Sequence, residues 1–274
     1  MISVIIRCGD DSRVFDCINS IKKSILNDSL EIIVSLTPNL QIQNQLNQIN
    51  INYCIATRFN IAASANIGIG KCFGDKIIIT DSDTIFEPTT VQLLSDALNI
   101  YEIVKPKIIF KSIQGSILSK LVSNLRSVFN DSEKMYTPGV SFRREIISKI
   151  GNYYFDESVP WSEDSEFSDR VIQSGLNSSY IRNALIYHPH IGVKHDLAGA
   201  ILIGAYKKNL YRRNNLKKRL LFYKKLYQNY GIGTLLYGFI WYLLFDVGRY
   251  TRYTGFLGQS FLSVIWKYIG RKKQ

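Results

Sequence analysis

Short apolar runs rich in β-branched residues recur along most of the chain, and each predicts a buried strand. They span residues 2–7, 30–36, 51–56, 76–80, 107–110 and 179–190. Between these runs the apolar residues recur at helical spacing, over residues 12–26, 61–73, 89–98, 113–129 and 164–175. Strands that alternate with helices predict an α/β fold with a Rossmann-like, mostly parallel sheet and helices on both of its faces.

The pattern changes after Asp196, where an apolar stretch is followed by a basic amphipathic one. Residues 232–245 then form a run of 14 positions without a charge, which contains Trp241. A membrane span needs about 20 apolar residues, so this run favours a helix that lies in a membrane interface. A core helix packed on the domain is the alternative. We therefore expect a domain of residues 1–200 and a basic, apolar helical region of residues 201–274.

The net charge of +12 is unevenly distributed along the chain. Residues 1–193 carry 18 Lys and Arg against 20 Asp and Glu, whereas residues 194–274 carry 16 against 2. A basic excess confined to one end favours a polyanionic partner, either a membrane surface or a nucleic acid. Tyrosines interleave with the basic residues there, but no nucleic-acid-binding motif is present, and the uncharged run favours lipid.

Missing motifs argue against several kinds of chemistry. The four cysteines form no CxxC pair and no zinc-site spacing, and they are expected as free thiols in a reducing cytosol. The opening residues, MISVIIR, lead directly into a strand pattern without a basic leader, so residues 1–193 are expected in the cytosol. The chain has no dinucleotide-binding GxGxxG, no P-loop and no serine-hydrolase GxSxG.

Two aspartates, Asp81 and Asp83, follow the apolar run of residues 76–80. In a parallel α/β sheet, ligands bind at the carboxyl ends of the strands, so the pair lies where a ligand is expected. Carboxylates two positions apart can share one hard cation, and Mg²⁺ or Mn²⁺ often bridges to substrate phosphates as well. A solvated turn is the alternative.

A second group of carboxylates lies in residues 161–170, WSEDSEFSDR, around Glu163 and Asp164. One of these carboxylates can serve as a general base that takes a proton from a substrate hydroxyl. Trp161 offers a flat face to a sugar ring. The alternative is an acidic first helical turn, which interacts favourably with the helix dipole.

The three histidines of the chain lie within eight residues, at and just after the end of the last predicted strand, at His188, His190 and His195. Imidazole is an acceptable ligand for Mn²⁺, so one of them is a candidate metal ligand. Exposed histidines without a role are the alternative.

The order of these segments resembles that of the family-2 glycosyltransferases, which have a GT-A fold. The segments that carry the resemblance are SVIIR, NIAASANIGIGKCFGDKIIITDSD, TPGVSFRRE, FDESVPWSEDSEFSDRV and ALIYHPH. The resemblance covers about residues 2–205. It implies a GT-A fold, to which the C-terminal basic amphipathic helical region is added.

The resemblance also implies a role for individual positions. The residues implied in donor binding are Arg7, Ser35, Asn66, Asp81 and Asp83. Those implied in binding Mn²⁺ or Mg²⁺ are Asp83, His188 and His190. Those implied in acceptor binding are Gly139, Trp161 and Glu163, and Asp164 is implied as the general base beside Glu163. The first loop, RCGDD, and Ser35 depart from the family pattern, which leaves the nucleotide open, with a UDP-sugar favoured.

The implied activity is an inverting, metal-dependent transfer of a sugar from a nucleotide sugar to a lipid-linked or cell-surface glycan acceptor. The protein would be peripheral, at the cytoplasmic side of a membrane, with residues 201–274 against the lipid surface. A nucleotidyltransferase-like enzyme is one alternative, because it also uses carboxylates and a metal. A non-catalytic protein that binds polyanions through its basic tail is another, although no nucleic acid is expected as a partner.

Overall fold

The structure, a computed structural model, describes residues 1–56, 60–159, 161–206 and 215–254. These residues form two compact units. The first is built from residues 1–109 and 133–188, and the second contains the described residues of 110–132 and 189–274. Packing therefore places residues 110–132 with the C-terminal region, whereas the boundary expected from the sequence lies at residue 200.

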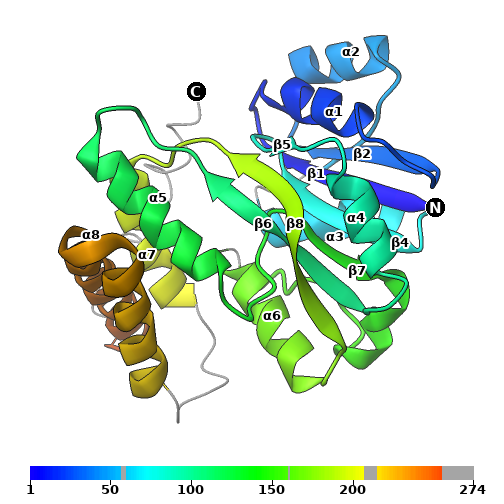
Figure 1. Ribbon diagram of the computed structural model, residues 1–274. Coiled ribbons are helices and arrows are strands. Elements are labelled where there is room, and N and C mark those ends of the chain that lie inside the picture. Colours follow the sequence, from blue (N-terminus) through cyan, green and yellow to red (C-terminus); the bar gives the residue numbers. More distant parts are fainter. Residues whose placement is uncertain (57–59, 160, 207–214, 255–274) are drawn as a thin grey trace. The chain divides into compact units, whose positions relative to one another are not determined.

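An eight-stranded mixed sheet forms the frame of the first unit (Figure 1). Its strands are β1 (Ile2–Cys8), β2 (Leu30–Leu36), β3 (Asn52–Ile55), β4 (Lys76–Asp81), β5 (Ile85–Phe86), β6 (Ile103–Phe110), β7 (Val140–Arg143) and β8 (Ser178–His188). Their spatial order is β3-β2-β1-β4-β7-β6-β8-β5. Strand β1 pairs in parallel with β2 and β4, and β2 pairs in parallel with β3. Strand β7 pairs antiparallel with β4 and β6, and β5 pairs antiparallel with β8.

The predicted α/β fold is confirmed, with a sheet that is mixed rather than mostly parallel. The regular alternation of strand and helix that predicts parallel pairing holds only as far as β4. The predicted strand at 107–110 begins earlier, at Ile103, because Lys105 and Pro106 interrupt the apolar run without ending the strand. Lys105 is 1% exposed and donates from Nζ to the carbonyl oxygen of Lys134 at 2.9 Å.

The helices of the first unit are α1 (Val14–Lys22), α2 (Leu40–Gln48), α3 (Ile61–Lys71), α4 (Thr90–Ala97) and α6 (Glu163–Gln173), with a 3₁₀ helix at Arg144–Lys149. Helix α2 was not predicted because its only buried side chains are Ile42 and Leu46, among Asn and Gln. Helix α3 packs closely on β1, since a Cβ at Gly68 would meet the side chain of Ile5. The small residues of α3 therefore allow the close approach of helix and strand.

The strand register brings three predicted donor-binding residues into one row. In the β1–β2 pairing Arg7 lies opposite Ser35, and in the β1–β4 pairing Arg7 lies opposite Asp81. All three lie at or near the carboxyl ends of their strands, which is the edge of the sheet where α/β proteins bind ligands.

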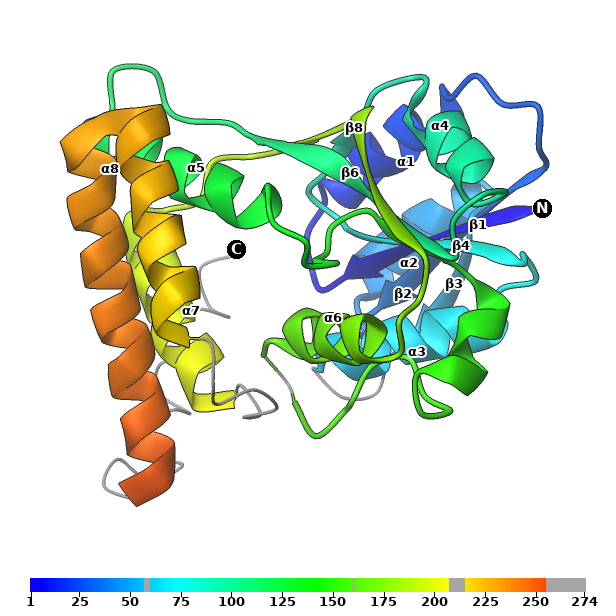
Figure 2. The same ribbon diagram turned by 60° about the horizontal axis from the view of Figure 1, so that its bottom comes forward.

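The second unit is a bundle of α5 (Ile117–Asn130), α7 (Val193–Tyr206) and α8 (Asn215–Thr254). The chain leaves helical geometry at Gly231, with φ 79° and ψ −175°, so α8 consists of two segments. They run side by side in opposite directions (Figure 2), because Tyr223 stacks on Phe239 at 4.1 Å and Arg219 pairs with Asp246 at 2.6 Å. Residues 215–254 are therefore a helical hairpin.

Asp196 is fully buried in the bundle and connects its three helices. Its carboxylate accepts a hydrogen bond from Arg126 Nε of α5 at 2.6 Å and one from the Tyr237 hydroxyl of α8 at 2.7 Å. Burial, together with the nearby charge of Asp196, raises the pKa of Tyr237. The apolar run at 232–245 thus has one face in the bundle core, formed by Tyr237, Trp241 and Phe245.

Candidate functional site

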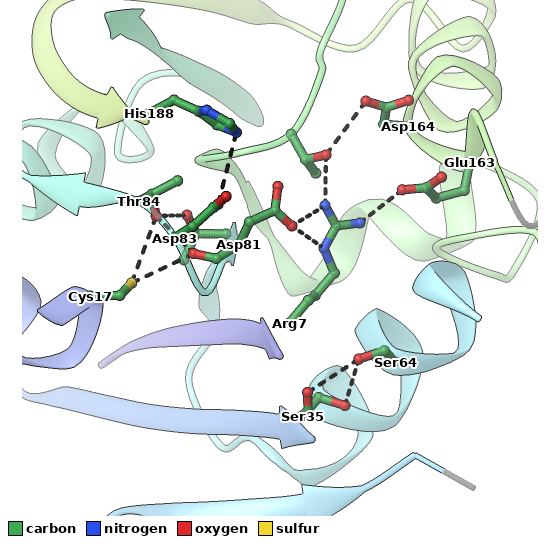
Figure 3. A network of polar contacts seen from close by, with 12 residues as sticks. Arg7, Cys17, Ser35, Ser64, Asp81, Asp83, Thr84, Glu163, Asp164 and His188 are labelled. Carbon is green, nitrogen blue, oxygen red and sulfur yellow. Dashed lines mark hydrogen bonds and ion pairs between the residues drawn. The ribbon is translucent and has the colours of Figure 1, made fainter. Parts of the chain in front are cut away.

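Arg7 of β1 lies at the centre of the candidate site (Figure 3). Its guanidinium donates to Asp81 Oδ1 from Nη2 at 2.7 Å and from Nε at 3.1 Å. Its Nη1 lies 2.8 Å from Glu163 Oε1, and Nη2 donates to Thr137 Oγ1 at 2.9 Å. One buried cation therefore connects the end of β4, the segment before β7 and the N-terminus of α6.

The charge of Arg7 explains how β4 can end on an acidic residue, Asp81. The Arg7 side chain is 7% exposed and that of Glu163 is 6% exposed, so both charges are largely removed from water. Burial alone disfavours the charged guanidinium, but the carboxylates of Asp81 and Glu163 outweigh it and raise the pKa of Arg7. Asp81 thus has a permanent positive partner supplied by the chain itself.

The turn after β4 directs Asp83 toward a second positive group. The Thr84 hydroxyl donates to the carbonyl oxygen of Asp81 at 2.9 Å and fixes this turn. Asp83 Oδ2 lies 3.4 Å from Arg13 Nη2, and its Oδ1 lies 3.8 Å from His188 Nε2. Asp11 holds the Arg13 guanidinium by a 2.6 Å contact.

These contacts bear on whether a divalent cation fits the site. Asp83 of the turn after β4 and His188 at the end of β8 converge, and their oxygen and nitrogen atoms suit Mn²⁺ or Mg²⁺. Within the described residues, no group of three or more His, Cys, Asp or Glu side chains gathers as a ready metal site. The residues present fit part of a coordination shell, which leaves positions for phosphate oxygens and water.

The first turn of α6 carries the second pair of carboxylates. Ser162, the residue before the helix, has a φ of 93° and is 7% exposed, so a non-glycine residue holds a strained backbone there. Glu163 is 4% exposed, whereas Asp164 is partly exposed. Asp164 Oδ1 accepts from the Ser165 amide at 2.7 Å, and the Thr137 hydroxyl lies 3.4 Å from its Oδ2.

Burial shifts the titration of both acids. It raises the pKa of Glu163 to about 7, with the neighbouring charge of Asp164 adding to the rise and Arg7 opposing it. Burial also raises the pKa of Asp164, again against the effect of Arg7. Near neutral pH the pair therefore holds a carboxylate that can gain and lose a proton, which is the requirement for a general base.

We predict that Glu163 makes the protein less stable as pH rises toward neutrality. Folding raises its pKa from 4.5 to about 7, so the folded state binds the proton more tightly than the unfolded chain. The contribution of Glu163 to the free energy of unfolding is then fully present below about pH 4.5 and falls by about 1–3 kcal/mol as pH rises through 7. Urea unfolding of the wild type and Glu163→Gln at several pH values measures this. If the free energy of unfolding had the same pH dependence in both proteins, the raised pKa of Glu163 would be contradicted.

Two predicted donor-binding residues have their polar atoms engaged by the fold. Ser35 is fully buried, and the Ser64 hydroxyl of α3 donates to its Oγ at 3.0 Å. Asn66 Nδ2 donates to the Phe155 carbonyl oxygen at 2.8 Å and to Glu157 Oε1 at 3.1 Å. Ser35 thus connects β2 to α3, and Asn66 connects α3 to the loop before α6.

The remaining predicted residues are placed as follows. His188 lies in the first unit beside Asp83, whereas His190 and His195 belong to the second unit, and His190 is exposed. Trp161 is partly exposed two residues before α6. Arg13 and Thr137 were missed as site residues. Thr137 lies in the segment TPGVSFRRE that carries the resemblance, but nothing in the sequence marks Arg13.

Gly139 is required by packing. Its φ is +84°, and a Cβ there would lie 2.5 Å from Pro106 Cγ and 2.5 Å from Ile186 Cδ1. Its amide donates to the Ile79 carbonyl oxygen at 2.7 Å, which joins this turn to β4. The glycine thus lets the segment that contains Thr137 approach the sheet.

We predict that Gly139→Ala lowers the free energy of unfolding by about 2–4 kcal/mol, from the strained backbone and the steric overlap together. Gly175→Ala is the matched control, since Gly175 has a φ of +67° but nothing lies within 4 Å of its Cβ position. Gly175→Ala is expected to lower the free energy of unfolding by about 1 kcal/mol. Chemical denaturation of both variants measures the difference, and equal losses would contradict the packing role of Gly139.

The fold is similar to that of solved structures, among them structures of S. aureus TarS. No protein-family model and no curated protein matches the sequence. S. aureus TarS 1–349 in complex with UDP matches with a TM-score of 0.54 and 15% identity, over 100% of this chain and 92% of that one. Its complex with UDP-GlcNAc matches with a TM-score of 0.53 and 13% identity, over 93% and 92%.

A longer TarS structure matches with a TM-score of 0.53 and 14% identity over 91% of this chain. This chain spans 55% of that TarS chain. At such identity the likeness shows the fold, and it confirms the GT-A-like α/β fold expected from the sequence. The narrower resemblance to family-2 glycosyltransferases stays a prediction.

Proposed function

We propose that this protein is a glycosyltransferase that uses a nucleotide-sugar donor. The observation that carries the proposal is the convergence of two carboxylate pairs at one edge of a GT-A-like sheet. Asp81 ends β4 and Asp83 lies in the turn after it, Glu163 and Asp164 begin α6, and Arg7 connects the two pairs. The similar TarS structures contain UDP and UDP-GlcNAc, which supports a UDP-sugar as the first donor to test.

In this proposal Asp83 and His188 are the residues that would hold Mn²⁺ or Mg²⁺. A bound divalent cation stabilises the negative charge that develops on the leaving nucleoside diphosphate. Asp81 faces the nucleoside side of the donor, and two hydrogen bonds from Arg7 hold its carboxylate in position.

Asp164 is the general base of the proposed reaction. It is more exposed than Glu163, whose carboxylate is held by Arg7 at 2.8 Å. Asp164 takes the proton of an acceptor hydroxyl as that oxygen bonds to the anomeric carbon. The bond from this carbon to the diphosphate breaks, and the nucleoside diphosphate leaves with the electron pair. A single displacement of this kind inverts the anomeric centre.

The proposed acceptor is a lipid-linked or cell-surface glycan, and the proposed site of reaction is the cytoplasmic side of a membrane. Trp161 supports a glycan acceptor, because its partly exposed ring precedes the catalytic helix and can stack on a sugar face. Glu163 would lie beside the acceptor without taking its proton.

Donor turnover tests this function. The purified protein is incubated with a panel of nucleotide sugars in Mn²⁺, Mg²⁺ or EDTA, and the released nucleotide is identified. We expect one donor to release its nucleoside diphosphate in the presence of metal, and Asp83→Asn to lose this activity. Asp96→Asn, an exposed carboxylate on α4, is the matched control and keeps it. Release of pyrophosphate would instead show nucleotidyl transfer.

A further inference from the structure

The second segment of α8, after Gly231, carries an apolar face that points away from the bundle core. The exposed aliphatic side chains of this face are Ile232 at 59%, Leu236 at 56%, Ile240 at 50%, Leu243 at 66% and Val247 at 40%, and Phe239 and Tyr250 of the same segment are exposed as well. The five aliphatic residues recur every three or four residues, so they lie on one side of the helix. The opposite side carries the buried Tyr237, Trp241 and Phe245. We call the five exposed aliphatic residues the outer face of α8.

A helix on the surface of a soluble protein presents charged and polar residues on its outer side. The outer face of α8 has the reverse character, since all five of its side chains are aliphatic and at least 40% exposed. Apolar surface of this extent in one patch marks a contact site. Something apolar therefore covers the outer face when the protein works.

The charge of the region selects the kind of partner. The first segment of α8 carries exposed lysines at Lys217, Lys218 and Lys224, whereas Lys225 lies 3.9 Å from Asp131 Oδ2 at the end of α5. Residues 194–274 carry 16 basic residues against 2 acidic ones, so two copies of this region would repel each other. An anionic lipid surface offers both an apolar layer and opposite charge.

We infer that the outer face of α8 is inserted into the interface of a membrane that contains anionic lipids, with the lysines at the headgroups. By length and composition alone, Leu216–Thr251 contains a helix that could cross a membrane. The reversal at Gly231 argues for a helix that lies in the interface instead, because the two segments of the hairpin are antiparallel.

The position of the lysines in the hairpin supports this orientation. Tyr223 stacks on Phe239, and Leu226 packs against Gly238, so Lys224 and Lys225 lie level with the middle of the second segment. A spanning second segment would bring these lysines to the depth of the hydrocarbon, where charged side chains are costly. In the interface the exposed Lys224 can reach lipid phosphates.

The structure also corrects the sequence-based picture of this region. Trp241 was expected as an interfacial aromatic residue, but it is 4% exposed and packs against Phe129 and Phe245 in the bundle. Its role is in the core, and the aliphatic residues on the other side of the helix form the lipid contact. The run at 232–245 is thus both a core helix and an exposed surface, on opposite faces.

This inference rests on the membrane location in the proposed function but is independent of the reaction in the first unit. A lipid-bound α8 would hold the enzyme at the surface where a lipid-linked acceptor is presented. Turnover of a soluble donor does not need that contact. Vesicle binding and donor turnover can therefore fail separately.

The test is sedimentation of the full-length protein with vesicles of phosphatidylcholine and phosphatidylglycerol, or of phosphatidylcholine alone. We expect binding to the anionic vesicles, weakened about tenfold or more by the double substitution Leu236→Asp and Leu243→Asp. The controls are Phe73→Asp and Ile25→Asp, which replace side chains of the first unit that are 80% and 68% exposed. Both are expected to bind as the wild type does.

Further outcomes decide the proposal. Replacement of Lys217, Lys218, Lys224 and Lys225 by Gln is expected to remove the preference for anionic vesicles. Circular dichroism and thermal melting confirm that each variant is folded. Binding by the Leu236→Asp, Leu243→Asp variant equal to the wild type would overturn the proposal. It would also be overturned if the wild type were a dimer that this variant dissociates, since a second copy would then cover the outer face.

Discussion

The Asp164→Asn variant is expected to transfer sugar about 10²–10⁴-fold more slowly than the wild type, the usual contribution of a general base. An amide of the same shape cannot accept the proton of the acceptor hydroxyl. Asp164 is the member of the α6 pair that is not paired to Arg7 and is partly exposed. Donor binding is expected to stay the same, because the donor lies at Asp81 and Asp83 in the proposed complex. The measurements are single-turnover transfer and donor affinity.

The matched control is Asp16→Asn, which neutralises an exposed carboxylate on α1. It is expected to leave both the rate and the affinity unchanged. If Asp164→Asn transferred sugar within about threefold of the wild type, Asp164 would not be the base. A loss of donor affinity equal to the loss of rate would point to a structural role.

Arg7→Met is expected to lower the free energy of unfolding by about 3–5 kcal/mol, because it breaks a buried ion pair and leaves acids without a positive partner. Arg7 pairs with Asp81 and with Glu163, and the guanidinium also binds Thr137. The methionine is apolar and of similar length, so packing changes little. Urea unfolding at neutral pH measures the effect.

Two further variants make this test specific. Arg13→Met removes a guanidinium that is 44% exposed, and its ion pairs are expected to contribute about 0–1 kcal/mol. The double variant with Arg7→Met and Glu163→Gln is expected to recover part of the lost stability, since one unpaired charge is gone. A loss below about 1 kcal/mol in Arg7→Met would contradict the central role of this cation.

Much of the site could be predicted because its residues follow strong local signals. The β-branched runs that form β1 and β4 end at Arg7 and Asp81, and parallel strands place such ends at the same edge of a sheet. The acids Glu163 and Asp164 begin a helix whose period is clear in the sequence. Local pattern therefore sufficed to name Asp81, Asp83, Glu163 and Asp164 as candidates.

The partners of these acids could not be predicted from pattern. Arg7 and Glu163 are 156 positions apart, and only the packing of α6 beside β1 brings them together. From the sequence, a metal and a diphosphate were expected to offset the charge of the aspartates. In the structure, Arg7 and Arg13 already lie against Asp81 and Asp83. The helical hairpin was missed for a similar reason, since one residue, Gly231, reverses a chain whose two segments both have helical character.

The proposed function requires that the edge of the sheet at Asp81 and Asp83 bind a nucleotide-sugar donor. Titration calorimetry of the wild type and Asp83→Asn with UDP, in the presence and absence of Mn²⁺, tests it most directly. We predict metal-dependent binding by the wild type that Asp83→Asn weakens at least about tenfold, as expected when one charged ligand is lost. Binding that neither the metal nor the substitution changes would contradict the claim, as would the absence of binding for UDP and for every other nucleoside diphosphate tested.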